Sequence, residues 1–172
     1  MADIDYEILN VVDKMDRVIG QRTRSEIHRL SLIHRAVHAL VFNSSGRLFL
    51  QQRSLSKDMN PGLWDSSAAG HVDAGENYDD CVVREVREEL GINAPGRFEQ
   101  LFKIEAIPAT GMEFCTVYRL MDDGPFRLNA TEVQRGNWFL LEEIDSWISF
   151  GGDALTSTFQ IIWLTARKTY IQ

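Results

Sequence analysis

The chain is poor in cysteine, in basic residues and in long apolar runs. Its two cysteines, Cys81 and Cys115, are too few for a disulfide scaffold and lack the spacing of a metal knuckle. No run approaches the roughly 20 apolar residues of a membrane-spanning helix. The first ten residues are acidic and lack the basic and apolar regions of a signal peptide. We therefore expect a cytoplasmic protein that does not insert into a membrane.

Basic residues are fewer than acidic ones: the chain has 18 lysines and arginines and 25 aspartates and glutamates, which gives a formal net charge of −7. Proteins that bind nucleic acid or anionic membranes through bulk charge need clustered lysine and arginine, so we expect neither partner. An anionic substrate would have to be recruited by something else, such as a metal ion. The oligomeric state is open between a monomer and a homodimer.

Linkers and repeats are also absent. No segment rich in Pro, Gly and Ser divides the 172 residues, and 44% of them are hydrophobic, which is enough to fill a core. The length suits one domain. We therefore predict a single domain over residues 1–172, in which residues 1–30 form an N-terminal extension with two strands and a helical turn.

The rest of the chain alternates strand-like and helix-like patterns. Two strand-like runs, 35–42 and 47–53, flank a glycine-containing turn and predict a β-hairpin. Residues 54–75 lack periodicity and hold several turn-forming residues, so mostly loop is expected there. Further strands are expected at 98–107, 113–121 and 137–141, and helices at 77–91, from about 142, and over 155–170. The predicted fold class is α/β, with a mixed β-sheet sandwiched between α-helices.

The clearest helix covers residues 77–91 and stops at Gly91, which is typical of a C-terminal cap. With 3.6 residues per turn, its apolar residues fall on one face: Val82, Val83, Val86 and Leu90. Glu85, Glu88 and Glu89 fall on another face, where the like charges at i and i+4 repel. That face is either a solvated acidic surface balanced by neighbouring arginines or a site for a hard divalent cation.

The segment 70–92 resembles the signature of the Nudix family, G-x5-E-x7-R-E-U-x-E-E-x-G-U, where U is apolar. Every specified position matches: Gly70, Glu76, Arg84, Glu85, Val86, Glu88, Glu89, Gly91 and Ile92. Chance agreement is on the order of 10⁻⁹ per start site at ordinary residue usage. The order of predicted strands on either side is also similar to the Nudix fold, so the resemblance spans about residues 30–172.

The resemblance implies a metal-dependent hydrolase that cuts the diphosphate linkage of nucleoside di- or triphosphates or of nucleoside-diphosphate-linked metabolites. It implies that Mg²⁺, or else Mn²⁺, is held by Glu85, Glu88, Glu89 and the carbonyl group of Gly70. Arg84 would have a structural role, orienting these carboxylates and pairing with Glu76. Bound metal would neutralise the diphosphate and lower the pKa of an attacking water.

Two carboxylates are candidates for the general base. Glu85 can serve from the helix, whereas Glu132 lies in a loop six residues before Trp138, as a loop glutamate does in MutT-like members. Glu132 is otherwise an exposed loop residue. Arg53, at the end of a predicted strand, is a phosphate clamp or an ordinary surface arginine, and Lys57 follows it as a further candidate phosphate ligand.

Residues 34–64 resemble isopentenyl-diphosphate isomerase, which shares the fold and uses a cysteine and a glutamate beside a histidine-rich metal site. The isomerase cysteine corresponds to Ala69 here, which has no proton to give. Glu113 matches the glutamate-bearing strand and is a candidate substrate-binding residue. His34 and His71 lie where isomerase histidines would, or are packed in the core. We therefore expect a hydrolase; an isomerase-like enzyme is the alternative, followed by a non-catalytic module that senses a nucleotide.

Overall fold

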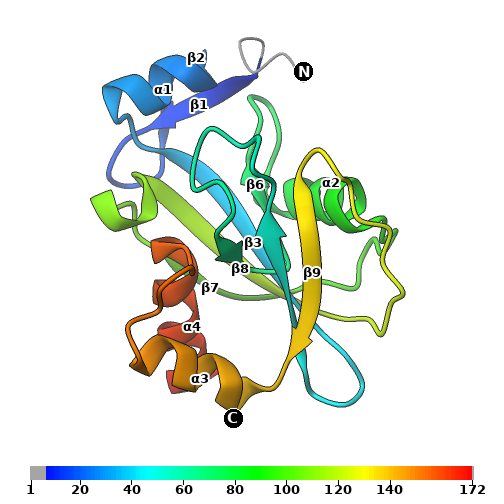
Figure 1. Ribbon diagram of the computed structural model, residues 1–172. Coiled ribbons are helices and arrows are strands. Elements are labelled where there is room, and N and C mark those ends of the chain that lie inside the picture. Colours follow the sequence, from blue (N-terminus) through cyan, green and yellow to red (C-terminus); the bar gives the residue numbers. More distant parts are fainter. Residues whose placement is uncertain (1–6, 172) are drawn as a thin grey trace.

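The computed structural model describes residues 7–171, which form an N-terminal unit, a seven-stranded sheet and helices that pack on that sheet (Figure 1). The predicted domain bounds include residues 1–6 and 172, which lie outside the described residues. No helix within 7–171 is long and apolar enough to cross a membrane.

The N-terminal unit consists of residues 8–30. Strands β1 (Ile8–Val12) and β2 (Val18–Thr23) pair antiparallel, and helix α1 (Arg24–Leu30) follows directly. Thr23 caps this helix: its hydroxyl group accepts a hydrogen bond from the Glu26 amide, and its own amide donates to the Glu26 carboxylate. The unit has a small buried cluster of its own, made of Leu9, Val11 and Ile27. The two strands and helical turn predicted from the sequence are confirmed.

The main sheet has the strand order β5-β4-β3-β8-β7, with β6 paired to β3 and β9 paired to β4. Its strands are β3 (His34–Phe42), β4 (Leu48–Arg53), β5 (Trp64–Asp65), β6 (Ala68–His71), β7 (Glu99–Ile104), β8 (Glu113–Met121) and β9 (Val133–Phe139). The β3–β8 pair is parallel and the other pairs are antiparallel, so the sheet is mixed. The predicted hairpin is confirmed as β3 and β4.

Helices cover both faces of the main sheet (Figure 1). They are α2 (Tyr78–Leu90) on one face, and α3 (Leu141–Ser149) and α4 (Ser157–Thr169) on the other. Successive side chains of a strand point to opposite faces. Accordingly, Val37 and Val41 of β3 pack in the cluster that contains α2, whereas Leu40 and Phe42 pack in the cluster that contains α3 and α4. The predicted mixed sheet between helices is confirmed.

One segment and one strand boundary differ from the sequence prediction. The segment 54–75, predicted to be mostly loop, contains the short strands β5 and β6. The Ala-Ala-Gly-His run of β6 has little intrinsic strand propensity, and it is extended because it pairs with β3. Strand β9 begins at Val133 rather than near Asn137, because its first residues pair with the end of β4.

Candidate active site

Helix α2, which carries the signature carboxylates, is fixed at both ends. The side chain of Asn77 accepts a hydrogen bond from the Asp80 amide (2.8 Å) and caps the N-terminus. Gly91 has a left-handed conformation (φ 72°), and its amide donates to the carbonyl of Arg87, so the predicted C-terminal cap is confirmed. Since the apolar face packs on the sheet, the carboxylates project from the side of an anchored helix.

Glu85 lies against strand β6 at Gly70. Its side chain is only 12% exposed, and a Cβ atom at position 70 would overlap its carboxyl group. Glycine is therefore required for this close approach of strand and helix. The contact places the backbone of Gly70 beside the Glu85 carboxylate.

Glu89 is almost fully buried and is held by two hydrogen bonds. Its Oε2 accepts from Nε2 of Gln51 (2.7 Å) and from the backbone amide of Ala69 (3.1 Å). Burial raises the pKa of Glu89, and the neighbouring Glu85 raises it further. Burial also raises the pKa of Glu85, against the opposing charge of Arg84. A cation bound between the two carboxylates would favour their ionised forms.

Arg84 connects the acidic residues of the signature. Its guanidinium group donates to both carboxylate oxygens of Glu76 (2.9 Å each) and to one oxygen of Glu85 (2.6 Å). It also donates to the carbonyl of His71 (3.0 Å) and, at 3.3 Å, to Glu88, whose side chain is 48% exposed. The paired bonds to Glu76 match the fork geometry of arginine, so this residue fixes the loop before α2 as well as Glu85.

The donors along α2 suit a hard divalent cation in kind, since carboxylate and carbonyl oxygens are the ligands that Mg²⁺ and Mn²⁺ prefer. The close approach of Gly70 to Glu85 supports such a site. Within residues 7–171, however, the side-chain groups whose ligand atoms all lie within 4.8 Å of one another are found around Glu113 instead. Binding of one cation by all three helix carboxylates therefore requires at least one of these side chains to move.

The loop after β4 contacts the loop before β9, which brings Lys57 and Glu132 together as an ion pair. The amide of Ser54 also donates to the Glu132 carbonyl (3.0 Å). The second loop is joined to α2, because the amide of Asn129 donates to the carbonyl of Glu89 (3.0 Å). Burial dominates the raised pKa of Glu89, but Lys57 is near enough to oppose it. The loop that carries Glu132 is therefore joined to the backbone of α2 at Glu89, and the charge of Lys57 acts on the Glu89 carboxylate.

Arg53 is engaged by its own loop. Its Nε and Nη2 donate to the carbonyl of Met59 (3.2 and 3.1 Å), and its Nη1 lies 3.7 Å from the Asp65 carboxylate. The side chain is 13% exposed, so it is not an ordinary surface arginine. It anchors the loop that carries Lys57, and a phosphate would have to compete with the Met59 carbonyl for it.

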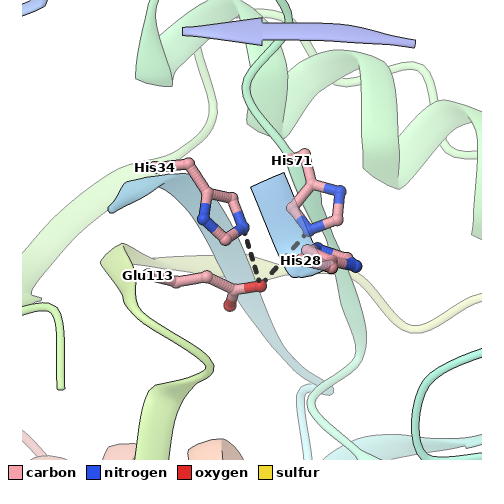
Figure 2. Close-up of side chains that lie close together, drawn as sticks. All are labelled: His28, His34, His71 and Glu113. Atoms are coloured by element: carbon pink, nitrogen blue, oxygen red, sulfur yellow. Dashed lines mark hydrogen bonds and ion pairs between the residues drawn. The ribbon is translucent and has the colours of Figure 1, made fainter. Parts of the chain in front are cut away.

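Glu113, predicted to bind substrate, lies among three histidines (Figure 2). Its Oε1 is 3.2 Å from Nε2 of His71 and 3.5 Å from Nε2 of His34. The ring of His28 lies 5.4 Å from that of His34 and 5.2 Å from that of His71, measured between centroids. We call His28, His34, His71 and Glu113 the histidine cluster. Sequence reasoning missed His28, which falls in the N-terminal extension; the one signal was the match of His34 and His71 to isomerase histidines.

Charge is distributed unevenly in the histidine cluster. Burial opposes ionisation of Glu113, yet the histidines beside it hold its pKa well below the usual range. Burial would also lower the pKa of His71, but hydrogen bonds with Glu113 and Glu7 raise it to about 9. Burial and the charge of His71 lower the pKa of His28 to about 4. At neutral pH, His71 is therefore charged and His28 is neutral in this structure.

Known proteins share the sequence and the fold of this chain. The NUDIX domain family matches residues 32–156. An uncharacterized Nudix hydrolase of Pseudomonas aeruginosa is 40% identical over 138 residues, which is 80% of each chain. The crystal structure of DR0079 from Deinococcus radiodurans is similar with a TM-score of 0.83 at 30% identity, covering 95% of this chain and 99% of that one.

A mixed sheet between helices, with signature carboxylates on α2, defines a protein of the Nudix fold. The chain belongs to the Nudix family. These similarities support a Nudix pyrophosphohydrolase, as the signature predicts.

The predicted likeness to isopentenyl-diphosphate isomerase is also confirmed. A protein of Photorhabdus laumondii subsp. laumondii named isopentenyl-diphosphate Delta-isomerase 2 is 32% identical over 159 residues, covering 91% of this chain and 90% of that protein. Ala69, which corresponds to the isomerase cysteine, lies on β6, and its amide donates to Glu89. Its methyl side chain has no acidic proton.

Proposed function

We propose that this protein uses a divalent metal ion to hydrolyse the diphosphate linkage of a nucleoside di- or triphosphate or of a nucleoside-diphosphate-linked metabolite. The observation that carries the proposal is the pair of poorly solvated carboxylates, Glu85 and Glu89, held against the backbone of Gly70 and Ala69. Burial penalises both charges, and a bound cation would offset that penalty.

The metal would be held by Glu85, Glu88, Glu89 and the carbonyl of Gly70. When bound, Mg²⁺ or Mn²⁺ supplies positive charge for the diphosphate and lowers the pKa of a coordinated water. The chain keeps these ligands in place: Arg84 orients Glu85, and Gln51 orients Glu89. Because the protein is acidic overall, this local cation would recruit the anionic substrate, and nucleic acid is not a favoured partner.

Glu132 is the better general base of the two candidates. The Glu85 carboxylate is already engaged by Arg84 and would also ligate the metal. Glu132 pairs with Lys57, a cation that a substrate phosphate would attract. Transfer of Lys57 from Glu132 to the phosphate would release the Glu132 carboxylate to accept a proton from water. Arg53 would contribute to phosphate binding after leaving the Met59 carbonyl.

Product analysis of the purified chain with Mg²⁺ tests the proposal. The panel holds nucleoside di- and triphosphates, nucleotide sugars, ADP-ribose, dinucleoside polyphosphates and isopentenyl diphosphate. Metal-dependent release of a nucleoside monophosphate from one nucleotide class is expected. Conversion of isopentenyl to dimethylallyl diphosphate, with no nucleotide cleaved, would replace the hydrolase with an isomerase-like enzyme. Nucleotide binding without turnover would indicate a sensing module.

The base assignment is tested by comparing Glu132→Gln with Glu85→Gln. For Glu132→Gln, kcat should fall by about 10²–10⁴, as expected for loss of a general base, at an unchanged Mg²⁺ requirement. For Glu85→Gln, the Mg²⁺ concentration needed for half-maximal activity should rise. The opposite assignment of the two effects would move the base to Glu85.

We also propose that the chain is a single cytoplasmic domain, and that it is either a monomer or a homodimer. Two core clusters on either face of one sheet support the single domain. Light scattering on the purified protein would measure the oligomeric state.

A further inference from the structure

A groove at the C-terminal end of α2 is lined by two arginines that have no role in the site described above. Its volume is about 490 Å³, within the range of small-molecule sites, roughly 300–1,000 Å³. Arg87 and Glu88 line it from α2, and Arg127 and Asn129 line it from the loop before β9. We call this hollow the arginine groove.

Backbone contacts between the helix and the loop fix the shape of the arginine groove. The amide of Arg127 donates to the Leu90 carbonyl (2.9 Å). The amide of Asn129 donates to the Glu89 carbonyl (3.0 Å), so the loop satisfies carbonyl groups that the end of a helix leaves without partners. Gly91 permits this approach, because a Cβ atom there would lie only 3.0 Å from Cβ of Arg127. The loop is therefore docked on α2 through its main chain.

The residues that line the arginine groove leave its positive charge unbalanced. Within residues 7–171, neither Arg87 nor Arg127 makes an ion pair or a side-chain hydrogen bond. The carboxylate of the lining, Glu88, accepts a hydrogen bond from Arg84 instead (3.3 Å). A cation held by Glu88 would add further positive charge. The groove therefore suits an anion, and the planar fork of arginine matches the oxygens of a phosphate group.

The arginine groove adjoins the proposed hydrolytic site. Glu88, which lines the groove, is also a proposed metal ligand. The carbonyl of Asn129 accepts a hydrogen bond from the amide of Glu132, the proposed general base (3.0 Å). A phosphate in the groove would therefore lie next to a diphosphate that is bound by the metal.

The lining suits a phosphate better than a nucleobase. Bases in protein sites commonly stack on aromatic side chains. The aromatic residues near this end of α2, Phe126 and Trp138, pack against the core cluster and do not line the groove. Leu128 is the large apolar residue of the lining. The groove therefore has charge for a phosphate but no ring for a base.

We propose that Arg87 and Arg127 bind a third phosphate, and so select nucleotides with three or more consecutive phosphates over nucleotides with two. This inference rests on the proposed function, in which metal at α2 holds the diphosphate linkage that is cut. The additional phosphate lies outside that linkage and accepts hydrogen bonds from both guanidinium groups. Nucleotide sugars and ADP-ribose have no third phosphate, so they leave the groove empty and are poorer substrates.

Kinetics with the triphosphate and the diphosphate of one nucleoside test this selection. In Arg87→Gln and in Arg127→Gln, kcat/KM for the triphosphate should fall ~10–100-fold, as expected for loss of a charged hydrogen bond. For the diphosphate it should change by no more than about twofold, as for an ordinary surface substitution. Arg29→Gln, an exposed position on α1 with the same change of charge, is the control and should alter neither value. Equal losses for both substrates would overturn the selection.

A dinucleoside tetraphosphate distinguishes the two sources of an additional phosphate. Its kcat/KM is measured in the same variants beside that of the nucleoside triphosphate. A loss confined to one of the two compounds would identify that compound as the class that the groove selects, and a loss for both would show that either phosphate chain enters it. Unchanged values for both would overturn the proposal.

Binding of inorganic tripolyphosphate separates this inference from the proposed function. Calorimetry in the presence of Mg²⁺ compares tripolyphosphate with pyrophosphate, and the wild-type chain should bind tripolyphosphate ~10-fold more tightly or better. The double variant Arg87→Gln/Arg127→Gln should lose that difference; both side chains are exposed, so the fold should be kept. An arginine-dependent difference without turnover of any nucleotide would support the groove and refute the hydrolase. Turnover without such a difference would support the hydrolase and overturn the groove.

Discussion

Glu89 is a buried carboxyl group whose hydrogen-bond donors do not compensate the charge of its ionised form. Gln51 and the amide of Ala69 are both neutral, and the neighbouring Glu85 adds a second negative charge. Burying such a carboxylate costs stability unless a cation accompanies it. The ionised Glu89 carboxylate would therefore be more stable with a bound cation than in the metal-free fold.

Glu89→Gln removes the ionisable group and keeps the shape of the side chain. We expect kcat/KM to fall ~100-fold or more, the size of effect seen when one transition-state electrostatic contact is lost. The melting temperature of the metal-free variant should stay the same or rise, because the variant no longer holds a buried group whose ionisation is penalised. Activity across a Mg²⁺ titration and circular-dichroism melting would check both. Unchanged turnover with Mg²⁺ would exclude Glu89 from the metal site.

Arg84→Lys tests whether the planar guanidinium group of Arg84 is needed to hold Glu76 and Glu85 together. A lysine cannot reproduce the paired bonds to Glu76 together with the bond to Glu85. We expect a loss of about 1–2 kcal/mol in the free energy of unfolding and a lower turnover. Arg87→Lys is the matched control for stability, because Arg87 is exposed on the same helix. Equal urea midpoints for the two variants would contradict a special role for Arg84.

At the scale of elements, strand β6 connects three parts of the structure. It pairs with β3 through its backbone, lies against α2 at Gly70, and directs His71 to the histidine cluster. Small side chains at positions 68–70 make the approach to α2 possible. A change of one side chain in this strand therefore alters the position of the helix carboxylates.

Gly70→Ala tests the close approach of strand and helix. The new Cβ atom would overlap the Glu85 carboxyl group, which can move because it ends a flexible side chain. We therefore expect a modest stability loss of ~1–2 kcal/mol and a larger loss of Mg²⁺-dependent turnover. Gly20→Ala on β2 is the control, since a Cβ there meets nothing within 4 Å. Wild-type kinetics for Gly70→Ala would refute the contact.

Elements defined by a local pattern could be predicted from the sequence. Helix α2 follows from its apolar period and its cap at Gly91, and its carboxylates share one helix, so spacing alone predicts their order along it. Strand β6 could not be predicted, because pairing with β3 overrides its weak strand propensity. The meeting of His28 with Glu113 also lies outside sequence reasoning, since it depends on how α1 docks on the sheet.

At the scale of the whole molecule, Asp16 joins the N-terminal unit to the rest of the chain. Its carboxylate accepts hydrogen bonds from Arg35 of β3 (2.6 Å), from Tyr78 of α2 (3.0 Å) and from Lys103 of β7. Burial opposes the charge of Asp16, but these donors outweigh burial and lower its pKa. One turn residue therefore contacts three elements of the main fold.

Asp16→Asn tests this joint by removing the charge and one of the two acceptor oxygens, while asparagine also tolerates the left-handed backbone at this position (φ 58°). The lowered pKa means that Asp16 contributes stability above its unfolded pKa of about 3.9 and loses it as pH falls through the folded value. At pH 7 the variant should lose about 1–2 kcal/mol of unfolding free energy. Its deficit relative to wild type should shrink below about pH 4. The exposed Glu105→Gln is the control; an equal deficit at pH 7 and pH 3 would contradict the prediction.

The parallel pairing of β3 with β8 has a consequence for how the chain acquires its structure. His34 pairs with Glu113 and Phe42 pairs with Met121. Strand β3, which is nearly fully buried, is therefore synthesised long before its partner β8. Pairings this distant in sequence slow folding, and an unpaired apolar edge recruits other chains. A nascent or truncated chain that ends before residue 113 therefore presents β3 as a template for aggregation, and chaperone demand should be greatest in that interval.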